Sequence, residues 1–284
     1  TRKYRMNSRY RSSHISRSAR FAWSAFRRRE CIPVEDRSPG FVRFQVFVTA
    51  QQMSGWRQPM SLDATARREE LDRLLSGLRT DAETAVENRF VRSAEAGQLG
   101  RAQIARFLVA EHSAQSCEFT AFASLAARFP VGPAAGFFLD LACAVRCARA
   151  PLAEAAKAVD VSLEPWRVPL VSTEAHAFGA YLCWLAARAS QAGAALAVYT
   201  DFIAWCGACS RIAAAARTAS PLPDAVVAYF AGYAQEPEAL LAAAVDVVRD
   251  GLSGGDDPAQ AEAEARLVLG YLTRFWNTAA DLSA

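Results

Sequence analysis

The sequence of 284 residues lacks most of the features that identify common classes of protein. Val and Ile are scattered and alternating apolar runs are short, so signals for β-strands are almost absent. No uncharged apolar run reaches the roughly 18 residues that span a bilayer, because Arg188 interrupts the best candidate. Phosphate-binding glycine loops, G-x-G-x-x-G and H-E-x-x-H are also missing. We therefore expect an all-α, cytoplasmic protein that contains no membrane segment.

Histidine is scarce, with only residues 14, 112 and 176, and this leaves few nitrogen ligands for a metal site. The seven cysteines (31, 117, 143, 147, 183, 206 and 209) make an odd count, and all but Cys31 fall in helical patterns. Free thiols in a reducing compartment are the expected state. Cys206 and Cys209 have the spacing of a thioredoxin-type motif, but no strand precedes them, so we interpret both as core thiols.

The net charge of +3 conceals a basic N-terminal segment. Residues 1–59 hold 13 Lys and Arg against 3 Asp and Glu, whereas residues 60–284 hold 19 against 26. A basic arm could bind nucleic acid or anionic lipid, and its Arg/Ser-rich composition is also similar to a transit peptide. We favour a third interpretation, in which 1–59 is a disordered leader or translated upstream DNA and Met53 or Met60 is the true start. Nucleic-acid and membrane partners are then not expected.

The strongest periodic signal is the stretch 97–129. Its apolar residues recur every three or four positions, as in a helix with one buried face; they are Ile104, Phe107, Leu108, Phe119, Phe122 and Leu125. Glu111 and Glu118 fall on the same face, because seven residues return a helix to within roughly 20° of its starting direction. Buried carboxylates are costly unless they are paired or neutral, so the two acids indicate a site. The alternative is that both lie at the edge of this face and reach solvent.

Turn and capping signals divide the rest of the chain into further helices with short connections. The expected ranges are 61–78, 80–96, 133–148, 151–159, 172–192, 194–218, 223–234, 236–251 and 258–281, with an irregular crossing over 162–172. Absence of an internal repeat favours one helical-bundle domain over residues 60–284.

Two of these helices carry further candidate site residues. Glu174, Phe178 and Tyr181 share one face of the 172–192 helix. Glu174 also lies in the first turn, where the helix dipole alone favours an acid. Asp201 and Trp205 share a face of the next helix, and Asp201 lies there either in a pocket or toward solvent.

The order of several short motifs resembles one known family. A G-x-L turn precedes F-L-x-x-E at Phe107–Glu111, a Pro-broken crossing precedes A-F-G-A-Y-L at 177–182, and the last helix carries Arg274-Phe275-Trp276. This order, over roughly residues 62–282, is similar to the TenA/pyrroloquinoline-quinone-synthase family. The resemblance implies a haem-oxygenase-like, TenA-like helical bundle.

The resemblance implies three alternative activities. The thiaminase II positions fall on Glu111, Ala114, Phe178, Asp201 and Leu272, which supply no thiol nucleophile and no terminal Glu. The di-iron oxidase positions include Glu111, Glu118 and Asp201, but the later histidine-containing run is missing, so iron is only an alternative. The cofactor-free, quinone-synthase-like branch remains, with a catalytically decayed ligand-binding or regulatory protein as a further alternative.

We therefore predict a cofactor-independent enzyme with a central pocket, acting by general acid/base chemistry on a small aromatic or heteroaromatic metabolite. The predicted catalytic residues are Glu111, Asp201 and Glu118. The predicted substrate-binding residues are Glu174, Phe178, Tyr181, Trp205, Phe107, Tyr271 and Phe275. By analogy with the family we also expect a homo-oligomer, either a dimer or a tetramer, with a role in specialised metabolism.

Overall fold

A computed structural model describes residues 62–163, 172–219 and 222–281, so the predicted leader 1–59 and most of the predicted crossing lie outside the described residues. Within them the chain forms nine helices and no strand, which confirms the all-α prediction. The helices are α3 (Leu62–Ala85), α4 (Arg89–Glu95), α5 (Arg101–Arg128), α6 (Gly132–Ala158), α7 (Thr173–Arg188), α8 (Gln191–Thr218), α9 (Asp224–Gly232), α10 (Glu238–Ser253) and α11 (Pro258–Ala280).

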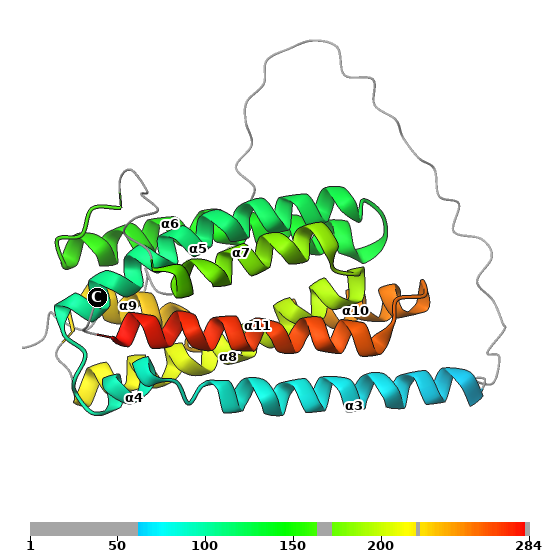
Figure 1. Cartoon of the computed structure of the whole chain (residues 1–284), viewed down its shortest axis with the longest axis horizontal. Coiled ribbons are helices and arrows are strands. Elements are labelled where there is room, and N and C mark those ends of the chain that lie inside the picture. The colour runs from blue at the N-terminus through cyan, green and yellow to red at the C-terminus, as the bar shows by residue number, and fades with distance from the viewer. Residues whose placement is uncertain (1–61, 164–171, 220–221, 282–284) are drawn as a thin grey trace, which may run out of the picture.

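The helices form a bundle in which α5 and α8 provide much of the interior. Figure 1 shows α5, α6 and α7 along one side, α8, α10 and α11 through the middle, and α3 with α4 along the opposite edge. Helix α5 packs against α6 and α7, while α8 packs against α10 and α11. Ile104, Phe107 and Leu108 of α5 are buried, as their spacing predicts. Phe119 was predicted on the same buried face but is exposed, with Arg149 over its ring.

The predicted break near residue 79 is wrong, because α3 continues through it. Leu78 and Ala82 are both buried and continue one apolar face across the position. Thr80, predicted to begin a new helix, instead donates its hydroxyl to the carbonyl of Ser76 within the same helix. The break occurs at Asn88, whose side chain accepts from Val91 N at 3.0 Å and so caps α4.

Two other predicted boundaries also differ from the structure. Helix α6 contains Pro151 in its interior, and it persists because Leu152 and Ala155 beyond the proline remain buried against the core. Gly193 does not separate α7 from α8. The junction lies at Ala189 and Ser190, and the Ser190 hydroxyl caps α8 by accepting from Gly193 N at 3.0 Å.

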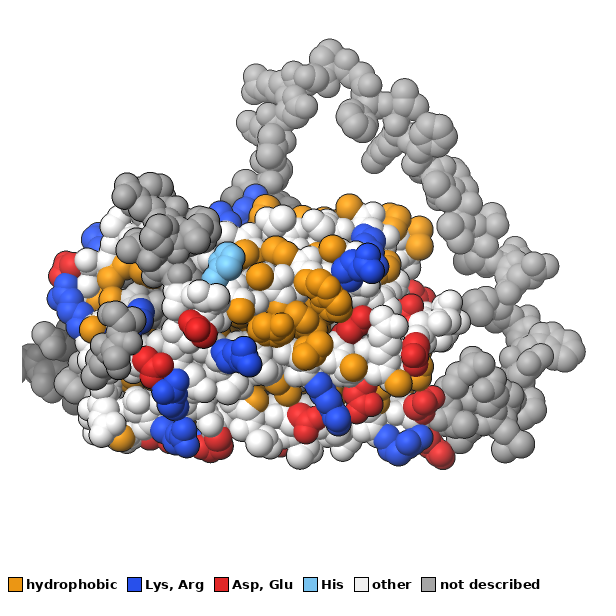
Figure 2. Space-filling model, in the orientation of Figure 1, with side chains coloured by type: hydrophobic (Ala, Val, Ile, Leu, Met, Phe, Trp, Pro, Cys, Tyr) orange, Lys and Arg blue, Asp and Glu red, His pale blue; other side chains and the backbone are white. Residues whose placement is uncertain are grey.

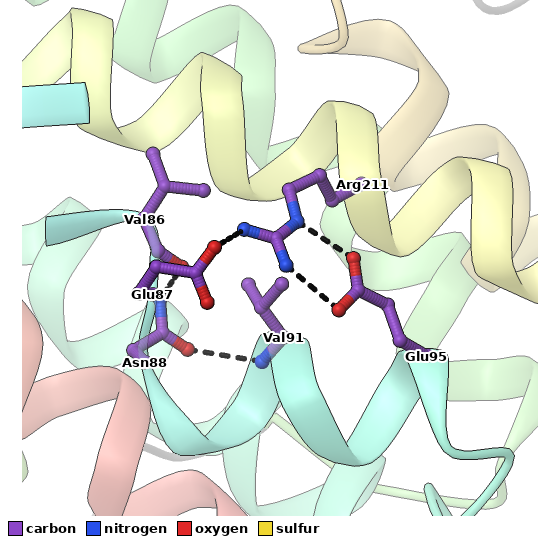
Figure 3. Close-up of polar contacts among 6 residues, drawn as sticks. All are labelled: Val86, Glu87, Asn88, Val91, Glu95 and Arg211. Atoms are coloured by element: carbon purple, nitrogen blue, oxygen red, sulfur yellow. Dashed lines mark hydrogen bonds and ion pairs between the residues drawn. The ribbon is translucent and has the colours of Figure 1, made fainter. Parts of the chain in front are cut away.

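Arg211 of α8 fixes the turn between α3 and α4. Its guanidinium donates two hydrogen bonds to Glu95, at 2.6 and 2.7 Å, and a third to Glu87 (Figure 3). Arg211 also lowers the pKa of Glu95 by donating to its carboxylate. These groups are largely exposed, so the ion pairs orient the turn more than they stabilise the fold.

Helix α8 is the one helix among the described residues that is long and apolar enough to cross a membrane. In the bundle, however, 83% of its most apolar window is buried against other helices. Core helices of globular proteins have the same composition, so packing alone accounts for the apolar character of α8.

Some large apolar side chains remain at the surface between α7 and α11. Trp184 of α7 is 43% exposed, and Leu267 of α11 is 50% exposed. Figure 2 shows hydrophobic side chains gathered over the middle of the face where α7 and α11 lie in Figure 1, with arginines and acids around them.

The beginning of α8 is set by contacts from α10 and the loop that follows it. Asp256 accepts from Ala192 N at 2.8 Å. Gly251 of α10 approaches so closely that a Cβ there would lie 2.6 Å from Asp256 Oδ2 and 2.8 Å from Ala192 N. A glycine at 251 is therefore needed for α10 to pack against the first turn of α8.

We expect Gly251→Ala to lower the free energy of unfolding by about 1–3 kcal/mol, because a methyl group there collides with backbone and with a capping carboxylate. Urea denaturation measures the change. The matched control is Gly136→Ala in α6, where an added Cβ has no neighbour within 4 Å; it should stabilise by roughly 0.5–1 kcal/mol. Equal stability of the two variants would contradict this account of the α10–α8 contact.

Candidate active site

A cavity of about 60 Å³ lies between α5, α6, α8 and the end of α9. Its polar lining comes from Glu111, Gln115 and Glu118 of α5 and from Asp201 of α8. The other lining residues are apolar or aromatic: Leu141, Ala144, Val145, Ala148, Phe202, Trp205 and Tyr233. The structure therefore brings the three predicted catalytic acids to one space, although they come from two helices far apart in the sequence.

Glu111 is the most enclosed of the three acids, at 4% exposed. Its Oε1 accepts two hydrogen bonds, one from the Tyr229 hydroxyl at 2.8 Å and one from the Gln115 amide at 2.9 Å. Gln115 lies one turn further along α5, whereas Tyr229 reaches across from α9. These two donors fix the orientation of the carboxyl group from two directions.

The acids hold their protons to unusually high pH. Burial raises the pKa of Glu111 from 4.5 to about 7, although the hydrogen bonds from Tyr229 and Gln115 oppose this shift. Burial, together with the charge of Glu111, raises the pKa of Asp201 from 3.8 to about 7. Burial and the charges of Glu111 and Asp201 raise the pKa of Glu118 well above 4.5. Desolvation and mutual repulsion therefore both favour neutral carboxyl groups.

No cation contributes to these pKa shifts within the described part of the chain. In addition, no set of three or more His, Cys, Asp or Glu side chains among the described residues could hold a metal ion. The three acids therefore line one cavity without forming a cluster of metal ligands. These residues do not form the ligand set of a di-iron centre, so no reaction step is assigned to iron at this site.

Three of the predicted substrate-binding residues belong to this region. Trp205 lines the cavity, as predicted. Phe107 and Phe275 do not line it but lie directly behind Trp205, each with its ring centroid 6.2 Å from that of Trp205. Phe107 also stacks on Trp276 at 5.1 Å. The two phenylalanines thus support the position of Trp205 and are not placed to contact a ligand in the cavity.

The other four lie elsewhere. The Tyr181 hydroxyl donates to the Glu264 carbonyl at 2.6 Å, and its ring stacks on Tyr271 at 4.6 Å, between α7 and α11. Phe178 is buried against Phe275. Glu174 is exposed in the first turn of α7, the place where the helix dipole favours an acid. None of these four residues lines the cavity that contains the three acids, because the apolar face of α7 packs toward α11.

Sequence reasoning missed Gln115, Tyr229 and Tyr233. Gln115 could have been found from the helical spacing, since it lies four residues after Glu111 and is buried on the same helix. Tyr229 and Tyr233 end a short helix more than a hundred residues away, and no local pattern indicates which acid they would meet.

Comparison with known proteins supports the fold. No protein-family model matches the chain, and no curated protein sequence matches it. Solved structures do match. A TenA homologue from Pyrococcus furiosus has a TM-score of 0.59 at 14% identity, with 73% of this chain and 98% of that chain covered.

Two further structures agree. A TenA homologue from P. horikoshii has a TM-score of 0.61 at 15% identity, with 73% of this chain and 98% of that chain covered. A TenA homologue from Pseudomonas syringae pv. tomato has a TM-score of 0.62 at 14% identity, with coverage of 78% and 96%. The chain therefore has the TenA-like helical-bundle fold that the sequence motifs indicated. Fold similarity at this identity does not establish an activity.

The raised pKa values predict how stability depends on pH. The folded protein keeps protons on Glu111 and Asp201 up to about pH 7, whereas the unfolded chain releases them near the ordinary values of 4.5 and 3.8. The free energy of unfolding should therefore fall as the pH rises from about 4 to 7, by about 3 kcal/mol for Glu111 alone.

Glu111→Gln should remove this component, because the glutamine stays neutral and its Oε1 can still accept from Tyr229 and Gln115. We expect the variant to be more stable than the wild type at pH 8, with the difference shrinking by pH 5, in denaturation curves recorded at both values. Glu174→Gln, at an exposed position, is the matched control. Identical pH dependence in wild type and Glu111→Gln would contradict the assignment.

Proposed function

We propose that the protein is an enzyme that carries out general acid/base chemistry on a small aromatic or heteroaromatic metabolite in the cavity lined by Glu111, Glu118 and Asp201. The observation that carries the proposal is the convergence of three carboxyl groups, two with pKa values raised to about 7, on one cavity with an aromatic wall. Such a carboxyl group can both give and take a proton near neutral pH.

Glu111 is the best positioned of the three to transfer a proton. Its carboxyl group is held by two donors on Oε1, so a reacting group meets it in one orientation. Asp201, on the facing helix, has the second pKa near 7 and can act in the opposite direction. A proton taken by one acid and returned by the other would allow isomerisation, elimination or hydrolysis without a cofactor.

The size and polarity of the cavity limit the ligand. A volume of about 60 Å³ is well below the roughly 150 Å³ of an apolar cavity that encloses benzene. A ring can therefore enter only in part, or when side chains at the edge such as the half-buried Phe202 move. Gln115 Oε1 and Asp201 Oδ1 are buried acceptors without a partner among the described residues. A ligand with N–H or O–H donors would compensate for their loss of water.

A thiaminase-like reaction with a covalent intermediate is less well supported. The lining side chains of the cavity include no thiol. Cys206 and Cys209 of α8 are buried, and burial raises the pKa of both thiols, which disfavours the nucleophilic thiolate.

To test the proposal, the full chain is incubated with a panel of small amino- and hydroxy-substituted pyrimidines, pyridines and quinolines. Mass spectrometry then measures which compounds are converted. Glu111→Gln should lower the rate for any compound that is converted by at least about 100-fold, the usual contribution of a positioned acid or base. Glu154→Gln, an exposed acid on α6 outside the cavity, should leave the rate unchanged.

Full activity in Glu111→Gln would overturn the assignment of the catalytic acid. Binding of a compound by the wild type in equilibrium dialysis without any conversion would instead favour the alternative of a ligand-binding protein whose catalytic function has decayed.

A further inference from the structure

We propose that Cys117 and Cys183 are an oxidation site, at which a peroxide joins α5 to α7 through a reversible disulfide. This inference is independent of the proposed function. It rests on the close approach of two helices and on the difference in exposure between two neighbouring thiols.

Helices α5 and α7 pack against each other and run in the same direction in Figure 1. They approach most closely where α7 has a glycine. A Cβ placed on Gly179 would lie 2.9 Å from Cys117 Sγ and 3.1 Å from Cys117 Cβ. The same Cβ would lie 3.8 Å from the Ala114 Cα. The Cys117 side chain is therefore packed directly against the backbone of α7.

Cys183 lies one turn beyond Gly179 on α7, and Cys117 lies one turn beyond Ala114 on α5. Cys117 faces Gly179, so Cys183 lies one turn beyond the residue of α7 that Cys117 contacts. The Cys183 side chain adds to burial in raising the pKa of Cys117, so the two side chains lie near each other. Both cysteines are free thiols in the structure. A disulfide requires cysteines on closely spaced backbones, and α5 and α7 approach closely at Gly179, one turn before Cys183.

The two thiols differ in reactivity. Cys183 is exposed, whereas Cys117 is half-buried, and burial raises the pKa of Cys117 to about 11. Cys183 is therefore the thiol that a peroxide meets first, and Cys117 is the resolving thiol.

The Cys183 thiolate attacks one peroxide oxygen, the O–O bond breaks, and the departing hydroxide takes a proton to become water. The product is a sulfenic acid on Cys183. Cys117 then loses its proton and attacks the Cys183 sulfur, and the sulfenic oxygen leaves as a second water. Overall, two thiols lose two electrons and one hydrogen peroxide is reduced to two waters.

The disulfide would constrain the helix that carries Glu111 and Glu118. Cys117 immediately precedes Glu118, which lines the cavity. A link between α5 and α7 also restricts the unfolded chain over a long loop, so it should stabilise the folded protein.

The experiment is titration of the reduced full chain with hydrogen peroxide, followed by alkylation of the remaining thiols and peptide mass spectrometry. We expect a peptide in which Cys117 and Cys183 of the same chain are linked, and dithiothreitol should break this link. The melting temperature should rise by roughly 5–10 °C on oxidation. Cys183→Ser, at an exposed position, should fold normally and lose both the peptide and the rise.

Cys143→Ser is the matched control, because Cys143 is also exposed but lies on α6. It should retain the linked peptide and the rise in melting temperature. The proposal is overturned if peroxide oxidises Cys183 only to higher acids, links it between two chains, or joins a different internal pair. It is also overturned if the melting temperature of Cys183→Ser rises as much as that of the wild type.

Discussion

Three carboxyl groups are removed from water at one place between α5 and α8, and no cation among the described residues compensates them. Tyr229 and Gln115 donate hydrogen bonds to Glu111, but these bonds offset only part of this cost. The acids therefore keep their protons to higher pH than ordinary carboxyl groups. Well-packed hydrocarbon at the same positions would stabilise the bundle more. Folding alone does not favour this arrangement, and this supports the proposed acid/base chemistry.

The bundle makes this arrangement possible by placing the acids on rigid elements. Glu111 and Glu118 lie on α5. Asp201 lies on α8, a helix most of whose residues are buried. Behind the cavity, aromatic rings from α4, α5, α8, α9 and α11 pack together, among them Phe107 and Trp276, which stack at 5.1 Å. Side chains held by long helices and a packed aromatic core keep fixed positions, which proton transfer between set partners requires. Enclosure by the same core also provides the low polarity that shifts the pKa values.

The sequence was informative where a local period decided the structure, although the same period placed the exposed Phe119 on the buried face. Spacing along α5 predicted correctly that Glu111 and Glu118 share a face, and family motifs indicated the TenA-like fold. Single boundary signals misled, because Thr80 and Pro151 are tolerated inside helices whose buried faces continue past them. The neighbours of the site could not be predicted in full. Whether the apolar face of α7 turns toward the cavity or toward α11 depends on packing between distant segments, as does the contact of Tyr229 with Glu111.

The central claim is that the buried carboxyl groups of Glu111 and Asp201 release their protons only near neutral pH, well above the range of ordinary acids. The most direct measurement is a titration of the side-chain carboxyl carbons by ¹³C NMR, with signals assigned through Glu111→Gln and Asp201→Asn. Since the two sites interact, they should titrate as a pair. The account predicts that both signals change between about pH 6 and 8. Titration of both groups below about pH 5, like ordinary surface acids, would contradict it.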